Sequence, residues 1–224
     1  MKPNLSRRQF VRTTVASAGA LACATAGADR SEVLAGEIGM KDGPQATKAL
    51  PLAETLSRQE LFEAISAIAE SNMRMCHHCA QASFLTLQEV FGLEGGSIIK
   101  ALTPLPGIAE RGETCGAVTG SLMALGLIFG RDRVDDWAAW RACLVPAREF
   151  CARFERDQGS TQCGDLLEKH FGRRFNLGDP ADLARFQSAQ PGPTEVCGGV
   201  VSRAVRMAAA VILESRQPSV GGSP

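Results

Sequence analysis

Helical periodicity, interrupted by glycine and proline, is the feature that most limits the fold of this chain. From Ser57 onward, apolar residues recur at helical spacing, as Leu61, Ile65 and Ala69 do. No window shows the strict alternation of apolar and polar residues between hairpin turns that marks a β-strand. We therefore predict an all-α protein, a single-domain bundle of about five to seven helices.

Capping residues predict where these helices begin and end. Ser57 and Glu60 have the spacing of a capping box, and glycines stand where several helices should stop. The expected helices are, in chain order, one from Ser57, one over 79–91 ending at Gly92, a short one near 98–102, one from Glu113 or Thr114 to Gly130, a long one from Asp132 to about Arg156 with a bend at Pro146, one capped by Ser160 or Thr161 that ends near Gly172, and a last one over 194–215. The segment between the last two is interpreted as a connection.

The N-terminus has the pattern of a twin-arginine export signal. Arg7 and Arg8 stand between Ser6 and Phe10, and a weakly apolar stretch leads to a small-residue cleavage site at Ala28. We expect residues 1–28 to be removed and the protein to be exported to the periplasm. Proteins that use this route often take up a cofactor before export.

Cys23, within the leader, offers a second interpretation as a lipid-attachment site. It ranks below simple cleavage, because Ala20 stands where such sites usually have leucine. After the leader we expect a flexible linker over 29–55, the helical domain over 56–216 and a disordered tail over 217–224.

Charge and hydropathy argue against two classes of partner. The leader holds four basic residues and no acid, so the rest of the chain has 20 Lys and Arg against 24 Asp and Glu. An acidic chain lacks the basic face that nucleic acid requires. No segment beyond the leader has about 18 uninterrupted apolar residues, so we expect no membrane span.

Four cysteines share one setting. Each lies within a turn of a predicted helix start, beside glycines or capping residues: Cys79, Cys115, Cys163 and Cys197. Helix N-termini carry unpaired N–H groups and a positive dipole end, which lower the pKa of a thiol. We predict that the four thiols converge. Gly116 and Gly120 share a helix face and would let a neighbouring backbone or an inorganic cluster approach closely, although such pairs also serve plain helix packing.

The stretches "CAQASF", "GETCGAVTG", "GSTQCGDLL" and "VCGGVV" resemble the C-GCAxxG-C-C family of redox-active proteins. The family is defined by four cysteines and the element that Cys115 to Gly120 matches here, and the resemblance runs from about Arg74 to Glu214. It is related to the cluster-binding part of split-Soret cytochromes. The resemblance implies an iron–sulfur cluster held by the four cysteines, and a role in electron transfer or redox sensing with a partner protein that the sequence does not identify.

The chemistry of four thiolates leaves the metal open. A two-iron cluster suits four cysteines, and tetrahedral zinc suits the same set. Covalent haem is not expected, because Ala80 stands where Cys-x-x-Cys-His motifs have histidine. Cys76, His77 and His78 are extra candidate ligands outside the family pattern. No catalytic residue is assigned, and no hydrolase motif is present.

Two alternatives compete with a metal site. Cys76 and Cys79 have the spacing of a thiol–disulfide redox motif, so the chain could be a thiol–disulfide oxidoreductase or a disulfide-stabilised structural protein. The cysteines could also be buried core residues, which is the interpretation for Cys143 and Cys151. Seven cysteines after the leader leave one thiol unpaired, which counts against a disulfide framework.

Three further residues have structural interpretations. His170 is expected to interact with the C-terminal dipole of its helix. Trp137 and Trp140 lie three apart on one helical face and are expected to be core or interface anchors, compatible with a homodimer.

Overall fold

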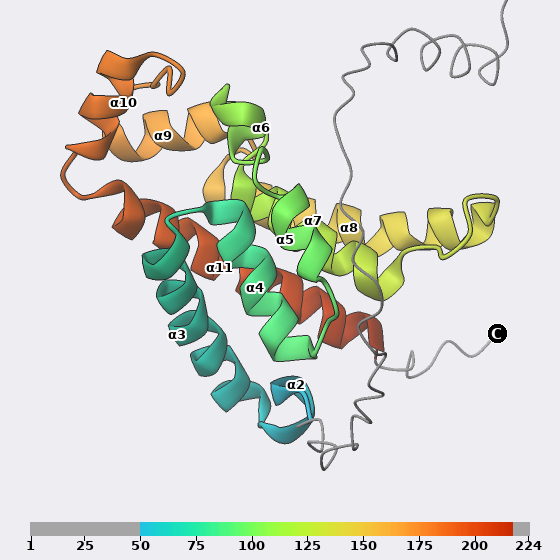
Figure 1. The fold of residues 1–224 in the computed structure, drawn as a ribbon. Coiled ribbons are helices and arrows are strands. Elements are labelled where there is room, and N and C mark those ends of the chain that lie inside the picture. The colour runs from blue at the N-terminus through green and yellow to red at the C-terminus, as the bar shows by residue number, and fades with distance from the viewer. Residues whose placement is uncertain (1–49, 217–224) are drawn as a thin grey trace, which may run out of the picture. The chain divides into compact units, whose positions relative to one another are not determined.

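The computed structural model describes residues 50–216, and its regular structure there is helical (Figure 1). Within that range it has ten helices: α2 (Leu52–Thr55), α3 (Arg58–Cys76), α4 (Cys79–Phe91), α5 (Gly96–Ala101), α6 (Gly107–Glu110), α7 (Gly116–Phe129), α8 (Trp137–Gln158), α9 (Cys163–Phe171), α10 (Pro180–Gln187) and α11 (Pro193–Arg216). The all-α prediction is confirmed, and the additional elements are the short helices α2, α6 and α10. The predicted leader with Cys23, most of the predicted linker and the tail lie outside the described residues.

Local caps set the start of α3 and the end of α4 as predicted. The side chain of Ser57 accepts a hydrogen bond from the N–H of Glu60, whose carboxylate accepts one from the N–H of Ser57. His77 ends α3 in the left-handed conformation, with φ 49°, and Gly92 ends α4 in the same way, with φ 64°. The chain therefore reverses within two residues, and α4 begins at Cys79.

Three helix starts differ from the prediction. α9 begins at Cys163 with Gln162 as its N-cap and no side-chain cap, rather than with a cap from Ser160 or Thr161. α7 begins at Gly116 rather than at Glu113 or Thr114, because the residues before it are extended and pair with the segment before α9. α8 begins at Trp137, because the side chain of Asp136, not that of Asp132, accepts the capping hydrogen bond from Ala139 at 2.8 Å.

α10 was interpreted as part of a connection, and that prediction was wrong. The side chain of Asp179 caps it by accepting from the N–H of Asp182 at 2.9 Å, and Pro180 occupies its first turn. Aspartate followed by proline is a recognised helix start, so the signal was present in the sequence.

α11 is the central helix of the bundle and packs against α3, α4, α7 and α8. Its inner face is made of small and branched residues, among them Val201, Ala204, Val205, Ala208 and Ile212, which are fully buried. Among the described residues it is the one helix long and apolar enough to cross a membrane by composition, and half of its apolar window is buried. In this fold that apolar surface forms the core.

Glycine lets α7 lie against α4 at short distance. A Cβ atom added to Gly120 would collide with the carbonyl oxygen of Ala80 and stand 3.0 Å from the Cβ of Ser83. A Cβ added to Gly116 would stand 2.8 Å from the backbone nitrogen of Ala80 and collide with the sulfur of Cys79. Gly120 therefore serves helix packing, whereas Gly116 faces a cysteine.

Because α4 and α7 lie so close, replacing two different glycines of α7 by alanine should change the free energy of unfolding in opposite directions. Gly120→Ala forces two backbones apart and should reduce the free energy of unfolding by about 1–3 kcal/mol. Gly126→Ala is the matched control, since that position is exposed with nothing within 4 Å of the added atom. It should stabilise the protein by up to about 1 kcal/mol through helix propensity. Thermal and denaturant unfolding measure both, and equal effects would contradict the packing.

Candidate metal centre

A short backbone pairing holds the starts of α7 and α9 together. The N–H of Cys115 donates to the carbonyl of Thr161 at 2.8 Å, and the N–H of Cys163 donates to the carbonyl of Glu113 at 2.6 Å. This pairing is the isolated antiparallel bridge that precedes both helices. Two cysteines 48 positions apart in the sequence are thereby fixed by main-chain hydrogen bonds rather than by their side chains.

The other two cysteines come from α4 and α11. Cys79 is the first residue of α4, and its sulfur lies against Gly116 at the start of α7. Cys197 lies in the first turns of α11. Four helix N-terminal regions therefore bring one cysteine each to the same place.

The structure brings the four predicted cysteines together. They line one cavity of about 30 Å³, with Cys115 buried and the other three partly buried. The rest of its lining is apolar except for one histidine: Leu166, Leu167, His170, Val196 and Val200. The seven cysteines of the described chain are free thiols.

The sulfur of Cys79 is the most stabilised as a thiolate. Its pKa lies below the ordinary value, first because the thiol of Cys115 donates a hydrogen bond to it. The backbone N–H groups of Ala80 and Gly116 act in the same direction, so the N-termini of α4 and α7 both stabilise this charge.

The other three thiols do not follow the prediction that helix N-termini would lower their pKa. Hydrogen bonding to Cys79 and then burial hold the pKa of Cys115 well above the ordinary value. Burial raises the pKa of Cys163 to about 12 and also raises that of Cys197. Desolvation outweighs the dipole here, because a thiolate loses its hydration in an apolar cavity.

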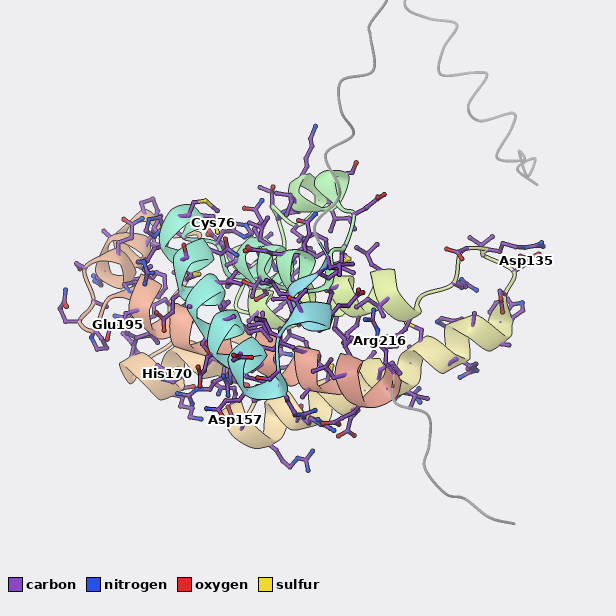
Figure 2. All side chains as sticks on the ribbon, turned by 90° about the horizontal axis from the view of Figure 1, so that it is seen from below. Cys76, Asp135, Asp157, His170, Glu195 and Arg216 are labelled. Atoms are coloured by element: carbon purple, nitrogen blue, oxygen red, sulfur yellow. The ribbon has the colours of Figure 1, made fainter. Side chains whose placement is uncertain are left out.

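Of the extra candidate ligands, His78 has both ring nitrogens in hydrogen bonds to other residues. Its Nδ1 accepts from the N–H of Gln81 at 3.2 Å, so Nε2 carries the proton and donates to the carbonyl of Thr103 at 3.0 Å. The thiol of Cys76 lies 3.6 Å from the carbonyl oxygen of His78 (Figure 2 labels Cys76 at the end of α3). Neither residue lines the small cavity.

His77 lies beside the cysteines but faces a different space. Its Nδ1 is 2.9 Å from the hydroxyl of Thr194, and the ring lines a larger cavity of about 370 Å³. Cys79, Cys163 and Cys197 line this larger cavity as well. Three sulfur-bearing residues therefore separate the two spaces.

Other side-chain predictions have mixed outcomes. Cys151 packs partly against the core, whereas Cys143 lies outside the core on the first half of α8, so its core assignment is wrong. His170 is in the last turn of α9 as predicted, and it also lines the four-cysteine cavity, which the sequence did not indicate. Trp137 is 64% exposed, which removes it from the core.

Residues 77–211 match the family described as "Putative redox-active protein (C_GCAxxG_C_C)". The chain belongs to this family. The matched range contains the four cysteines of the small cavity and the element from Cys115 to Gly120, so the C_GCAxxG_C_C pattern coincides with the residues that the fold brings together. No curated protein and no solved structure matched the chain.

The donor set of the small cavity suits a sulfur-ligated group. As the side chains stand, no three His, Cys, Asp or Glu residues between positions 50 and 216 form a group that could hold a metal ion. The four cysteines surround a space, with thiols as donors, an apolar shell and no competing carboxylate in its lining. Soft thiolates in an apolar shell suit iron–sulfur clusters.

Thiol reactivity tests the hydrogen bond between Cys115 and Cys79. In metal-free protein, Cys79 should be alkylated by iodoacetamide at lower pH than Cys163 or Cys197, because its pKa is lowered and theirs are raised. Peptide mass spectrometry across a pH series measures this order.

The Cys115→Ala variant tests whether the Cys115 thiol is the cause of the early alkylation of Cys79. Without the donated hydrogen bond, the alkylation profile of Cys79 should move to higher pH, while that of Cys143 stays in place. An unchanged Cys79 profile would show that Cys115 does not stabilise the thiolate.

Proposed function

We propose that this chain is an exported redox protein that binds an iron–sulfur cluster through Cys79, Cys115, Cys163 and Cys197, and that it acts in electron transfer or redox sensing. The observation that carries the proposal is the meeting of four cysteines, from four helix N-terminal regions, around one largely apolar cavity. The family membership supports redox activity in the same residues.

The electrostatics of the cavity support a bound cation. Three of the four thiols have raised pKa values, because thiolates crowded in an apolar space are unstable without positive charge. Iron supplies that charge, and binding would displace the thiol protons. The helix N-termini and their N–H groups then remain to hydrogen-bond the sulfur atoms and stabilise the negative charge of a thiolate-ligated cluster.

The number of ligands supports a two-iron cluster. Four cysteines satisfy two tetrahedral irons bridged by sulfide. Zinc in a Cys₄ site is the chemical alternative, but it needs the thiolates to converge on one ion. The redox character of the family favours iron, because zinc does not change its oxidation state.

Export of the folded protein with its cluster already bound would explain the twin-arginine pattern at the N-terminus. The four cysteines lie on helices spread over most of the domain, so the site exists only once the domain has folded. The twin-arginine pattern at Arg7 and Arg8 is typical of proteins that cross the membrane folded. Under this proposal the protein works in the periplasm and exchanges electrons with a redox partner protein there.

Anaerobic purification tests the cluster directly. The wild type should be coloured and contain about two iron and two acid-labile sulfide per chain. Cys115→Ser should lose most of both, whereas Cys143→Ser, which alters a thiol outside the core, should keep them. A colourless wild type that contains zinc alone would overturn the proposal.

One observation favours a second function, thiol–disulfide exchange. The Cys115 thiol hydrogen-bonds the lowered-pKa sulfur of Cys79, which is the relation of a nucleophile to its resolving partner. The active pair would then be Cys79 and Cys115 rather than Cys76 and Cys79. Iron-free protein that forms a reversible Cys79–Cys115 disulfide and reduces disulfide substrates would favour this function.

A further inference from the structure

The larger cavity beside the cysteines has the size of a ligand site. Its volume of about 370 Å³ falls in the range of small-molecule pockets, whereas ordinary interiors are packed without such spaces. Cys79, Cys163 and Cys197 line both this cavity and the small cavity, which Cys115 lines as well. A molecule held there would lie next to the proposed cluster.

The walls of this cavity are mainly apolar. They come from α3, α9, the segment before α10, α10 itself and the first residue of α11: Met73, Leu167, Leu177, Leu183, Phe186 and Pro193. Phe186 is fixed by edge and tilted ring contacts, with centroids 5.6 Å from Phe171 and 5.3 Å from Phe175. An apolar wall of this kind favours a largely apolar molecule with a ring.

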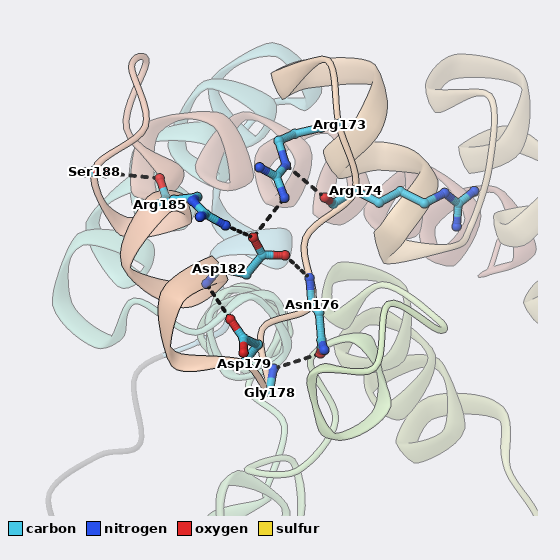
Figure 3. A network of polar contacts seen from close by, with 8 residues as sticks. All are labelled: Arg173, Arg174, Asn176, Gly178, Asp179, Asp182, Arg185 and Ser188. Atoms are coloured by element: carbon cyan, nitrogen blue, oxygen red, sulfur yellow. Dashed lines mark hydrogen bonds and ion pairs between the residues drawn. The ribbon is translucent and has the colours of Figure 1, made fainter.

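A polar network holds α10, which contributes residues to the cavity wall, against the segment that follows α9 (Figure 3). The carboxylate of Asp182 accepts hydrogen bonds from Arg173 at 2.8 Å, from Arg185 at 3.0 Å and from the backbone N–H of Asn176 at 3.0 Å. Asp182 thus joins α10 to the end of α9. Two sets of contacts therefore hold Leu183 and Phe186 in the wall: the hydrogen bonds of Asp182 and the ring contacts of Phe186.

The polar groups of the cavity select against anions. Glu110 lines it, and four thiolates around an iron–sulfur cluster would add negative charge. His77, an exposed residue, also lines the cavity; its Nδ1 is 2.9 Å from the hydroxyl of Thr194, and among the described residues no hydrogen bond reaches its Nε2. When Nδ1 accepts from that hydroxyl, Nε2 carries a proton that it can donate to a ligand oxygen.

We propose that this cavity binds a small, uncharged, mainly apolar ring compound with a carbonyl group. The ring packs between Leu183 and Phe186, and the carbonyl accepts from His77. The ligand's position beside the cluster rests on the proposed function, whereas its binding to the cavity does not need the cluster.

Two matched probes test the cavity without reacting with thiols. 2-Acetonaphthone is neutral and carries a ketone, and 2-naphthoate has the same ring with an anionic group. Calorimetry and saturation-transfer NMR on the full chain, purified without oxygen, should show that the neutral probe binds at least about tenfold more tightly. Glu110→Gln removes a negative charge from the cavity and should reduce the difference in affinity between the two probes.

Two variants of α10 distinguish binding of the probe in the cavity from nonspecific binding. Leu183→Trp fills the cavity and should abolish binding of the neutral probe, whereas Ala184→Trp, at an exposed position of the same helix, should leave it intact. Equal probe binding by both variants, or none by the wild type, overturns the inference. Iron and sulfide analysis of the same samples tests the cluster separately, so either proposal can fail alone.

A second, independent observation concerns the first half of α8. The segment "WAAWRACLV", residues 137–145, is apolar at eight of nine positions, yet none of its residues is buried. Together with the end of α7 it forms an arm that projects from the bundle, with Asp135 near its tip (Figure 2). Exposed large apolar side chains gather on this arm: Met123, Leu127, Val134, Trp137 and Val145.

Two features of the arm fit a second copy of the chain. Two packed helices with open apolar faces are half of a four-helix bundle, and a second copy supplies the other half. The tip, residues 131–136, holds three aspartates and two arginines, a net charge of −1, and Arg133 pairs with Asp135 at 2.7 Å. Residues 137–148 of α8 carry Arg141 and Arg148 and no acid. In an antiparallel two-fold pair, the net-acidic tip of each arm would face this basic stretch of the other.

We infer that two copies associate through this arm. Analytical ultracentrifugation of the wild type should give twice the mass of the chain. Trp137→Asp and Val145→Asp should give monomers. Met75→Asp is the matched control, because Met75 is 67% exposed and Val145 is 68% exposed.

The arm lies outside the cysteine site, so cluster content should not change in any of these variants. Circular dichroism checks that they remain folded, which exposed positions should allow. A monomeric wild type at the highest soluble concentration overturns the inference, as does a dimer that both arm variants retain.

Discussion

The close approach of α4 and α7 is the contact on which the cysteine site depends. Because Gly116 and Gly120 have no side chains, the backbone of α7 lies directly against Ala80, and the sulfur of Cys79 reaches the start of α7. The backbone pairing before α9 then adds Cys163, and α11 adds Cys197. A larger residue at either glycine would separate the helix ends and with them the sulfur atoms.

Charge explains why this site suits a metal-bound group better than a set of free thiols. An apolar cavity with four cysteines favours protonated thiols, as the raised pKa values of Cys115 and Cys163 show. One charge is stabilised locally at Cys79 by helix N–H groups and by the Cys115 thiol. Further thiolates require a cation, so the site couples the state of its cysteines to metal or to oxidation.

The sequence predicted elements whose ends depend on local residues. The capping box of α3 and the left-handed Gly92 that ends α4 involve neighbours within a few positions, and both were found as expected. The start of α8 was placed too early, because Asp132 and Asp136 are both adequate caps by composition. α10 was missed although Asp179 and Pro180 signal it, since its glycine- and proline-rich flanks favoured a connection.

The sequence by itself determined the helical class, the position of the four family cysteines near helix starts and the glycines that permit close packing, because these depend on residues adjacent in the chain. Only the tertiary structure decided which sulfur is stabilised as a thiolate, that Cys79, Cys163 and Cys197 face a second, larger cavity, and that α8 begins outside the core. Those properties arise from desolvation and contacts between segments far apart in sequence, for which local patterns carry no information.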